Sequence, residues 1–344
     1  MTEDVICRVE NGVGRITLNR PGALHALTRD MCVAMTDALV VWRRDASVSA
    51  VLLDHTGERG FCAGGDIRML AESGAADGRA AREFFFIEYR LNALLMAYEK
   101  PTLALMDGVV MGGGVGLALP CKTRVVTERT TFAMPETGIG LFPDVGGGWH
   151  LPRLPGKTGL WLALTGARIK GADCLALGIG THFVESGRIA DLKAAILGGD
   201  LDAAMKYASD PGPAPLLPHR ADIDRLFGGA TVEAIVAALA AEGSDWSNAQ
   251  GSTLAAKSPQ TLKVAFRQLA MGAAAKTFAE NMATEYRIGA RVVARHDFLE
   301  GVRAVSIDQD HAPKWKPATL EGVTDAMLDD IFAPLPAGEA WTEL

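Results

Sequence analysis

The hydrophobic and polar positions at the start of the chain predict a β-hairpin. Residues 5–9 and 13–18 read as strands, and they flank the dipeptide Asn11-Gly12. Both turn residues tolerate a positive φ, which the common two-residue hairpin turns require. We therefore expect the chain to open with two antiparallel strands.

Beyond the hairpin, the pattern predicts strands that alternate with helices. A helix is expected over residues 28–43. Continuous apolar runs at residues 50–54, 102–106 and 123–127 are typical of buried strands. This alternation indicates an α/β fold with a parallel sheet.

Glycine turns follow the first two buried strands. Residues 63–66 (Ala-Gly-Gly-Asp) precede a predicted helix at residues 67–71, and the glycines of residues 112–114 precede another at residues 115–119. In a parallel sheet these strand ends lie at one edge, where ligands usually bind. Glycine lets backbone N–H groups approach a ligand, and a helix N-terminus favours a developing negative charge.

Two carboxylates follow the second glycine turn. Residues 134–144 read Met-Pro-Glu-Thr-Gly-Ile-Gly-Leu-Phe-Pro-Asp, which places Glu136 and Asp144 shortly after the glycines. Carboxylates beside a glycine-lined anion site suggest acyl chemistry. Taken singly, either carboxylate reads as a helix-start or turn residue, so the prediction rests on their occurrence together with the glycines.

A third carboxylate, Glu88, lies on an apolar face of a helix that is predicted within residues 82–100. The apolar stripe around it has helical spacing and comprises Phe84, Ile87, Leu91, Leu94 and Leu95. A carboxylate on a buried face costs free energy unless it is paired or hydrogen-bonded. Glu88 is therefore either a structural hydrogen-bond acceptor or a pocket residue, and its position alone does not decide between them.

The composition excludes several classes of protein. Of the 344 residues, 49% are hydrophobic and 22% are charged, and the net charge is −7. Clustered Lys and Arg for a nucleic-acid surface are not found, so no nucleic-acid partner is expected. Five scattered cysteines without a Cys-x-x-Cys pair, and seven histidines without His-x-x-x-His spacing, indicate neither a disulfide framework nor a metal site.

Three segments of the sequence bear on membrane insertion, targeting and the division into domains. The apolar run of residues 103–119 is interrupted by Asp107 and by glycines, so no membrane-spanning segment is predicted. The acidic N-terminus, Met-Thr-Glu-Asp-Val, lacks the pattern of a secretion signal or a transit peptide, and we expect a cytoplasmic protein. From about residue 190 the sequence becomes Ala-rich and helical. We divide it into residues 1–190 and a mainly helical part, residues 191–344, of which residues 191–255 are the least defined.

Three of these motifs resemble a known superfamily. Residues 61–67 (Phe-Cys-Ala-Gly-Gly-Asp-Ile), the glycines of residues 112–114 and Met-Pro-Glu at residues 134–136 resemble the crotonase (enoyl-CoA hydratase/isomerase) superfamily. The resemblance implies the ClpP-like crotonase fold, an α/β spiral of repeated β-β-α units, with a helical C-terminal region here. The spiral would hold the CoA site and the active site.

Within the superfamily, the chain closely resembles the 3-hydroxyisobutyryl-CoA hydrolases. The resemblance rests on residues 111–117, on residues 132–153, and on two late motifs, Ile-Asp-Gln-Asp at residues 307–310 and Pro-Lys-Trp-Lys-Pro at residues 313–317. It covers nearly the whole chain and is weakest from about residue 190 to residue 255.

The resemblance implies a role for each candidate residue. The backbone N–H groups of Gly65 and Gly113 would form an oxyanion hole for the carbonyl oxygen of a thioester. Glu136 would attack the carbonyl carbon or act as general base on water, and the sequence leaves both routes open. Asp144 would orient the substrate and assist the water or the leaving group. Glu88 would hydrogen-bond in the same substrate pocket.

The resemblance also implies where CoA binds. The nucleotide and pantetheine parts would be held by Arg20, Ala23, Leu24, Ala63, Asp66, Ile67 and Arg68. Because CoA is part of the substrate, no separate cofactor is expected. Superfamily members often form trimers or hexamers, so a homo-oligomer is one of the alternatives that stay open.

The implied activity is hydrolysis of an acyl-CoA thioester. The expected substrate is 3-hydroxyisobutyryl-CoA, an intermediate of valine breakdown. Hydratases of the superfamily use two glutamates, and the position of the first is Gly116 here, which disfavours hydration. Two alternatives stay open: an enoyl-CoA hydratase or isomerase of the same fold, and a non-catalytic acyl-CoA-binding protein.

Overall fold

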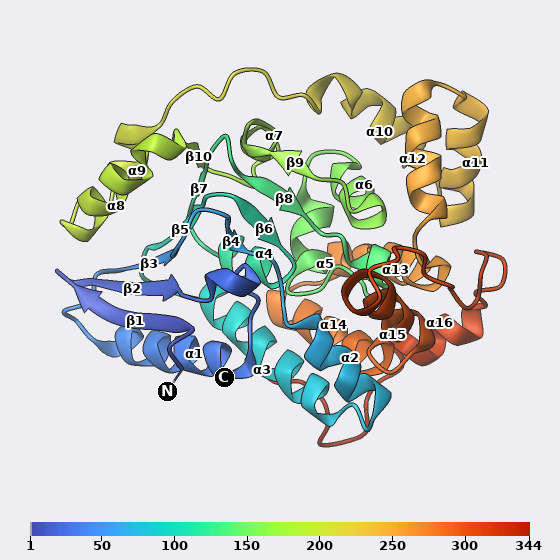
Figure 1. Ribbon diagram of the computed structural model, residues 1–344, viewed down its shortest axis with the longest axis horizontal. Helices are drawn as coiled ribbons and strands as arrows, with labels where there is room; N and C mark the ends of the chain where they lie inside the picture. Colours follow the sequence, from blue (N-terminus) through green and yellow to red (C-terminus); the bar gives the residue numbers. More distant parts are fainter. Residues whose placement is uncertain (1) are drawn as a thin grey trace.

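The computed structural model describes residues 2–344 and contains two β-sheets surrounded by helices (Figure 1). The larger sheet has six strands in the order β1-β2-β3-β5-β7-β10. The β1–β2 pair is antiparallel, and the other pairs in this sheet are parallel. Its strands are β1 (Val5–Glu10), β2 (Val13–Leu18), β3 (Ala50–His55), β5 (Thr102–Met106), β7 (Thr123–Val126) and β10 (His182–Phe183).

The smaller sheet has four short strands in the order β4-β6-β8-β9. They are β4 (Gly60–Cys62), β6 (Val109–Met111), β8 (Thr131–Ala133) and β9 (Ile169–Lys170). The chain passes from β3 to β4, from β5 to β6 and from β7 to β8 before it turns into a helix, so the implied repeat of β-β-α units is confirmed. The apolar pattern did not predict β4, β6 and β8, because three residues are too few to show a hydrophobic period.

The α-helices cover both faces of the larger sheet and form the C-terminal region. In chain order they are α1 (Arg29–Arg44), α2 (Ile67–Ala75), α3 (Arg79–Met96), α4 (Gly113–Ala118), α5 (Gly147–His150), α6 (Thr158–Thr165), α7 (Gly171–Ala176), α8 (Ile189–Leu197), α9 (Ala203–Tyr207), α10 (Arg220–Leu226), α11 (Val232–Glu242), α12 (Asp245–Ala255), α13 (Pro259–Ala274), α14 (Phe278–Val292), α15 (His296–Val302) and α16 (Asp325–Phe332).

The predicted opening hairpin and first helix are confirmed. In the hairpin Val5 pairs with Leu18, and the turn residues Asn11 and Gly12 have φ values of 49° and 81°. Helix α1 begins after Thr28, whose side chain accepts a hydrogen bond from a backbone N–H of the first turn.

The continuous apolar runs of the central strands have a simple cause. Leu52 of β3 and Leu103 of β5 face a core that α8 and α9 cover, whereas Leu53 and Ala104 face the main core on the other side. Successive side chains of a strand point to opposite faces, so a strand with a core on each face is apolar at every position. The predicted buried strands at residues 50–54 and 102–106 are confirmed.

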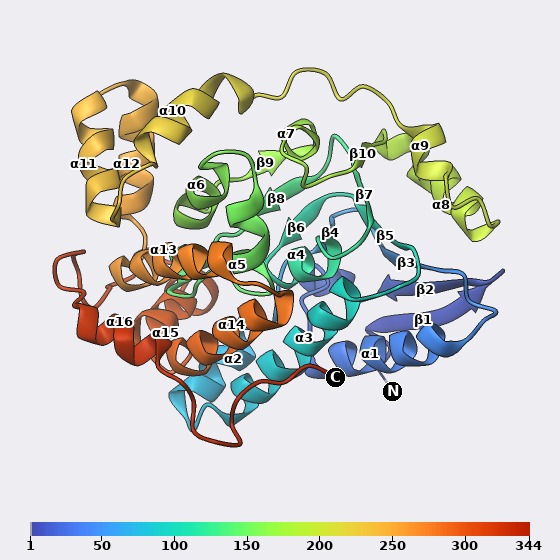
Figure 2. The same cartoon turned by 180° about the vertical axis from the view of Figure 1, so that it is seen from behind.

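From α10 onward, the C-terminal region packs against the spiral in one continuous core. Helix α14 packs on α3, α13 on α5, and α15 on α2 (Figure 2). The main hydrophobic cluster contains residues from Val5 to Trp341. The predicted division at residue 190 therefore describes the sequence pattern, while the packing joins the two parts.

Residues 191–255, the least defined part of the sequence, follow two separate paths. Helices α8 and α9 lie on the larger sheet, and an extended connection over residues 208–216 leads to α10, α11 and α12 (Figure 1). Helices α11 and α12 pack on each other, and α10 and α12 both contact α6. This part of the chain therefore contributes to the outside of the molecule.

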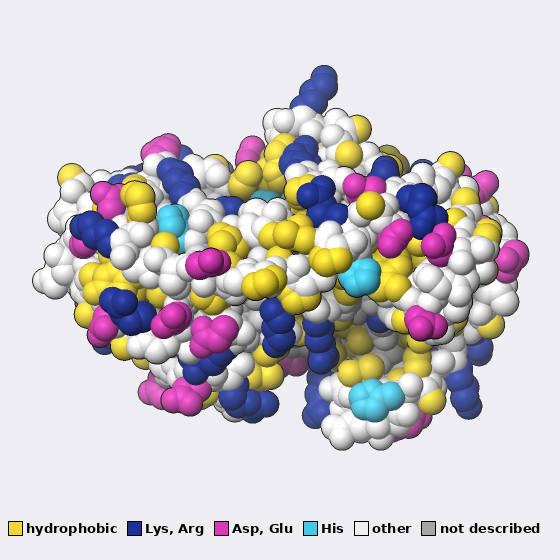
Figure 3. Space-filling view, turned by 90° about the horizontal axis from the view of Figure 1, so that it is seen from above, with side chains coloured by type: hydrophobic (Ala, Val, Ile, Leu, Met, Phe, Trp, Pro, Cys, Tyr) yellow, Lys and Arg dark blue, Asp and Glu magenta, His cyan; other side chains and the backbone are white. Residues whose placement is uncertain are grey.

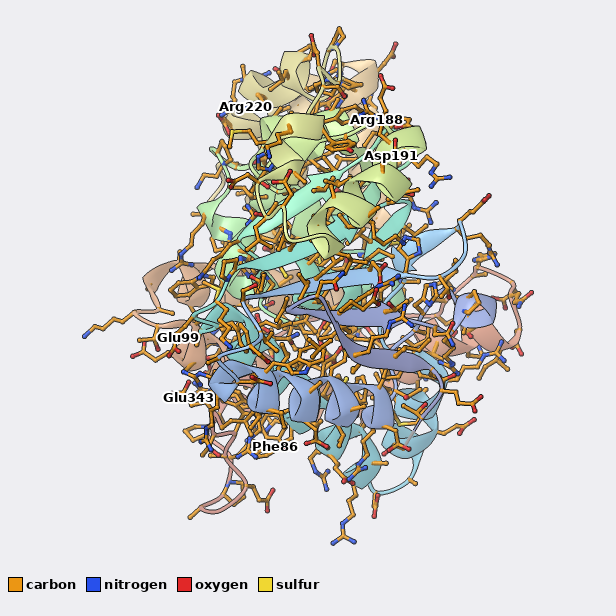
Figure 4. All side chains as sticks on the ribbon, turned by 90° about the vertical axis from the view of Figure 1, so that its left-hand side faces the viewer. Phe86, Glu99, Arg188, Asp191, Arg220 and Glu343 are labelled. Atoms are coloured by element: carbon orange, nitrogen blue, oxygen red, sulfur yellow. The ribbon has the colours of Figure 1, made fainter. Side chains whose placement is uncertain are left out.

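The upper face of the molecule carries mixed charge (Figure 3). On the face seen in Figure 3, Lys and Arg side chains are interspersed with Asp and Glu. In Figure 4, Arg188 and Asp191 lie together at the start of α8, and they form an ion pair of 3.8 Å. Near the C-terminus, Trp341 Nε1 donates to the backbone carbonyl of Phe86 at 3.2 Å, and Figure 4 labels Phe86 and Glu343 in the same lower part of the view. The last residues are thus held against α3.

The structure bears on two expectations, that the chain has no membrane-spanning segment and no metal site. In the part of the chain that the structure describes, none of the helices combines the length and apolar character needed to span a membrane. Within residues 2–344, no group of three or more His, Cys, Asp or Glu side chains is placed to hold a metal ion. The five cysteines have free thiols.

Candidate active site

The two glycine turns lie directly beside each other. Strands β4 and β6 pair in parallel, so the turns that follow them meet at one edge of the smaller sheet. A β-carbon built on Gly112 would lie 3.2 Å from Gly64 Cα. Both glycines have positive φ, 47° for Gly112 and 120° for Gly64, which a side chain would oppose. The turns thus lie together at one edge, as expected, but they follow the short strands β4 and β6 of the smaller sheet and not the long buried strands β3 and β5.

Two backbone amides in these turns are free to bind a ligand. At the first turn, Leu27 N–H donates to the carbonyl of Gly64, and Asp66 N–H donates to the carbonyl of Leu27. Among the described residues, neither Gly65 N–H nor Gly113 N–H has a hydrogen-bond acceptor. Gly113 begins helix α4, so its amide also carries the partial positive charge of a helix N-terminus. This pair of donors suits an oxyanion.

The predicted carboxylates meet these turns at a buried cavity of about 200 Å³. Glu136 begins the 3₁₀ helix η2 (Glu136–Ile139), and its Oε1 would lie 3.3 Å from a β-carbon on Gly112. Glu88 Oε1 would lie 2.6 Å from a β-carbon on Gly113. The cavity is lined by Ala63, Gly64, Gly65, Ile67, Leu70, Phe84, Phe85, Glu88, Gly112, Gly113, Pro135, Glu136, Ile139, Leu141, Asp144, Val145 and Val305.

The three carboxyl groups are almost fully withdrawn from water. Glu88 is 2% exposed, Glu136 is 4% exposed and Asp144 is 5% exposed. Glu88 Oε1 and Glu136 Oε2 have no hydrogen-bond partner among the described residues. The choice left open for Glu88 is therefore resolved in favour of a pocket position, with an oxygen available to a ligand or to water.

Burial controls the acidity of these groups. It raises the pKa of Glu88 and of Glu136 well above the ordinary 4.5, and the charge of Asp144 raises both further. Burial also raises the pKa of Asp144 to about 6, although hydrogen bonding from Tyr89 lowers it. Clustered carboxyl groups with raised pKa values are typical of catalytic sites.

Two residues of the site were not predicted from the sequence. Tyr89 O–H donates to Asp144 Oδ2 at 2.8 Å, and Glu285 of α14 accepts from the backbone N–H of Gly146 at 2.8 Å and of Gly148 at 2.9 Å. A signal for Glu285 exists in the sequence. It lies on an apolar stripe of α14, as Glu88 lies on one in α3.

The predicted CoA residues are only partly brought together. Ala63 and Ile67 line the cavity, and Ala63 N–H donates to the carbonyl of Leu24 at 3.0 Å. Arg20 pairs with Asp66 at 3.3 Å.

Arg68, the predicted phosphate contact, is turned toward the C-terminal region, where its Nε donates to Ser306 Oγ at 2.7 Å. Ala23 ends the 3₁₀ turn η1 (Pro21–Ala23), next to Leu24. The roles of all seven residues in CoA binding stay predictions.

A larger hollow lies elsewhere and lacks this chemistry. It has a volume of about 850 Å³ and lies between β1 and α1, where Val5, Ile6, Cys7 and Asp37 are among its lining residues. It contains neither glycine turn and none of the three buried carboxylates. The smaller cavity is therefore the candidate active site.

A family comparison decides the classification. Residues 13–332 match the family model described as enoyl-CoA hydratase/isomerase. The chain belongs to the enoyl-CoA hydratase/isomerase family. The resemblance stated from the glycine turns and residues 134–136 is thus confirmed.

Curated relatives and solved structures of this family are similar over most of the chain. The 3-hydroxyisobutyryl-CoA hydrolase, mitochondrial, of Danio rerio is 46% identical over 334 residues, which are 94% of this chain and 87% of the relative. The enzyme of the same name from Homo sapiens is 42% identical and covers 98% of this chain and 90% of the relative.

Among solved structures, a carnitinyl-CoA dehydratase from Mycobacterium thermoresistibile is 44% identical, with a TM-score of 0.94 and coverage of 98% of each chain. An enoyl-CoA hydratase from Rhodobacter sphaeroides 2.4.1 is 40% identical, with a TM-score of 0.91 and coverage of 99% of this chain and 100% of that one.

The comparisons confirm the fold and give two kinds of activity among the similar proteins. The curated relatives are named hydrolases, whereas the two structures are named dehydratase and hydratase. The curated relatives are also named as mitochondrial, so the predicted cytoplasmic location is not confirmed.

Proposed function

We propose that this protein hydrolyses 3-hydroxyisobutyryl-CoA to 3-hydroxyisobutyrate and CoA. Curated relatives that are 41–46% identical over most of the chain carry the name of this activity. The observation that supports it in the structure is one buried cavity that joins two free amides, Gly65 and Gly113, to the carboxylates of Glu136 and Asp144.

The proposed chemistry follows from these groups. The thioester carbonyl oxygen would accept hydrogen bonds from the two amides, which stabilise the oxyanion of a tetrahedral intermediate. In one route Glu136 attacks the carbonyl carbon and CoA leaves as a thiolate. Water then opens the mixed anhydride, its hydroxyl going to the acyl group and its proton to the thiolate, and the carboxylate of Glu136 is restored. In the other route Glu136 takes a proton from water, the hydroxide attacks, and the thiolate leaves and accepts the proton.

Neither route needs a separate cofactor, because water and the carboxylate supply every atom and proton that the reaction moves. We therefore propose that CoA enters only as part of the substrate. Asp144 would orient the acyl group through its 3-hydroxyl, and Glu88 would hydrogen-bond in the same cavity.

A hydratase is the second candidate, since two similar structures carry hydratase or dehydratase names. Hydration across a double bond needs a second acid or base, which superfamily hydratases would place at Gly116. A β-carbon built on Gly116 would lie 2.6 Å from Val145 Cβ and 2.8 Å from Asn92 Nδ2. Val145 and Asn92 thus fill the space that a glutamate would need, which favours the hydrolase.

Thiol release tests the proposal. We expect rapid release of CoA thiol from 3-hydroxyisobutyryl-CoA and 3-hydroxypropionyl-CoA, followed with a thiol-reactive dye, and slower release from acetyl-CoA. Hydration of crotonyl-CoA without thiol release would establish the hydratase instead. Calorimetric binding of these esters without turnover of any of them would establish the non-catalytic alternative.

Replacing Gly113 by Ala is expected to lower kcat by about tenfold. The new β-carbon would lie 2.6 Å from Glu88 Oε1 and 3.0 Å from Leu27 Cδ1, so the amide of residue 113 and the carboxyl group of Glu88 can no longer keep their present positions together. Steady-state thiol release measures the change. Gly251→Ala is the matched control, because a β-carbon there meets no atom within 4 Å. Equal kcat values for the two variants would contradict the role of Gly113.

Hydrolysis is expected to rise with pH through about 6. Both proposed routes use an ionised Glu136, and Asp144 acts as a charged acceptor. Burial raises the pKa of Asp144 from 3.8 to about 6 and that of Glu136 well above 4.5. Activity is therefore lost as pH falls through these raised values, at a higher pH than for exposed carboxylates. A profile of kcat/KM that stays flat down to about pH 5 would contradict this assignment.

We keep the cytoplasmic location as a proposal, although the curated relatives are named mitochondrial, and cell fractionation with marker enzymes tests it. A homo-oligomer and a monomer both stay open, and light scattering on the purified protein measures the mass that decides between them.

A further inference from the structure

The backbone turn that carries Asp144 adopts an unfavourable conformation. Val145, the next residue, has φ 51°, in the left-handed region that β-branched residues avoid. Gly146 follows with φ 91°. Such a conformation persists only where the surrounding structure holds it, and it is often found at functional sites. Neighbouring residues must therefore hold this turn in place.

A group of buried polar side chains from the C-terminal helices holds both ends of this turn. We call Gln268, Asn281 and Glu285 the clamp. Gln268 Nε2 donates to the carbonyl of Pro143 at 2.6 Å, just before Asp144. On the other side, Glu285 accepts from the N–H groups of Gly146 and Gly148.

Within the clamp, Glu285 is the central acceptor. Its Oε1 accepts from Gly148 N–H, from Asn281 Nδ2 at 2.8 Å and from Gln268 Nε2 at 3.2 Å, and its Oε2 accepts from Gly146 N–H. Glu285 is fully buried. A carboxylate can accept on both oxygens at once, whereas an amide must present N–H donors on one side. Burial raises the pKa of Glu285 to about 8, whereas the hydrogen bonds from Gly146, Asn281 and Gly148 lower it and favour the ionised carboxylate.

A second contact fixes the side chain of Asp144 itself. Tyr89 O–H donates to Asp144 Oδ2 at 2.8 Å, and Tyr89 is fully buried. Tyr89 follows Glu88 on α3, and α3 packs directly on α14, which carries Glu285 (Figure 2). Backbone and side chain of Asp144 are therefore held from three helices, α3, α13 and α14.

We propose that Glu285 and Tyr89 are positioning residues, which hold Asp144 in the orientation that the hydrolysis requires. Neither side chain lines the cavity, so each acts through Asp144 rather than on the substrate. The inference rests on the proposed function. It also gives the C-terminal region a role in catalysis, because α13 and α14 supply the clamp for a turn that belongs to the spiral.

Glu285→Gln tests the backbone part of the proposal. In Gln, an NH2 group replaces one of the two carboxylate oxygens. It would face either Gly146 N–H or the three donors at Oε1, so the turn loses at least one of the hydrogen bonds that Glu285 accepts. We expect kcat to fall by about 10- to 100-fold while KM changes by less than about threefold. Glu280→Gln is the matched control, because Glu280 lies on the same helix and its exposed carboxylate accepts from Lys276 N–H.

Tyr89→Phe tests the side-chain part and keeps the ring in place. The lost O–H donor removes a bond that favours ionised Asp144, so the acid limb of the kcat profile should move to higher pH. The other titratable groups that face Asp144 come from α3, η2 and α14, and they are Glu88, Glu136 and Glu285. Their side chains are the same in Tyr89→Phe, but the charge of Asp144 raises the pKa of each of them, so the shift is read for this coupled group as a whole.

The outcomes separate failure of this inference from failure of the proposed function. If wild type releases no thiol from 3-hydroxyacyl esters, the proposed function fails. If wild type is active but both variants keep wild-type kcat and pH profile per folded molecule, the positioning role is overturned. Circular dichroism and thermal melting give the folded fraction. Should Glu285→Gln not fold, Tyr89→Phe alone decides, since it removes one oxygen atom.

Discussion

Replacing Glu136 by Gln is expected to reduce hydrolysis of 3-hydroxyisobutyryl-CoA by about 10³- to 10⁴-fold. The amide can neither attack the thioester carbonyl effectively nor take a proton from water, so both proposed routes fail. Its shape matches that of Glu136, which is buried at the start of η2 next to Pro135. The change should therefore remove chemistry without remodelling the cavity.

Binding separates this result from misfolding. CoA esters should bind to Glu136→Gln with nearly unchanged affinity in calorimetry, because the proposed CoA contacts lie on other segments. Unfolding should not be easier than in wild type, since the amide removes a carboxylate whose pKa burial raises and whose Oε2 has no partner in the described part of the chain. The exposed Glu185→Gln serves as the control for the substitution itself.

Turnover of Glu136→Gln within about tenfold of wild type would contradict the assignment. The remaining candidates for the attacking or basic group would then be Glu88 and Asp144, the other carboxylates that line the cavity. Complete loss of both binding and turnover would instead indicate a structural role for Glu136.

The elements with long, regular apolar patterns were predictable. The run of residues 50–54 has a core on each face, and the helix around Glu88 has a stripe at helical spacing, so local sequence alone determines their type. The strands β4, β6 and β8 were not predictable, because a three-residue strand shows no period. They are specified by pairing with each other at the edge where the glycine turns meet.

The centre of the site was predictable for a different reason. Gly65, Gly113, Glu136 and Asp144 lie in short, recognisable motifs of one family, whose fold brings them together. Glu285 lies far along the chain from Asp144, and nothing local couples the two. Its partnership with the turn after Asp144 arises only when α14 packs against α5, which begins at Gly147.

The substitution Asp144→Asn addresses substrate recognition. We expect it to lower kcat/KM for 3-hydroxyisobutyryl-CoA by at least about 10²-fold, since a hydroxyl that donates to a charged acceptor loses its strongest partner. Asn can still accept from Tyr89 O–H through its amide oxygen, so the side chain should stay in place. Acetyl-CoA, which has no 3-hydroxyl, should lose far less.

The role of Asp144 follows from comparing the loss of kcat/KM for 3-hydroxyisobutyryl-CoA with the loss for acetyl-CoA. Because both esters share CoA, the thioester and the oxyanion, the difference between their losses isolates the contact with the 3-hydroxyl. Thiol release from each ester by wild type and Asp144→Asn, at a pH well above 6 so that the wild-type carboxylate is ionised, completes the comparison. Equal losses for both esters would mean that Asp144 acts on water or on the leaving group, and that another residue recognises the hydroxyl.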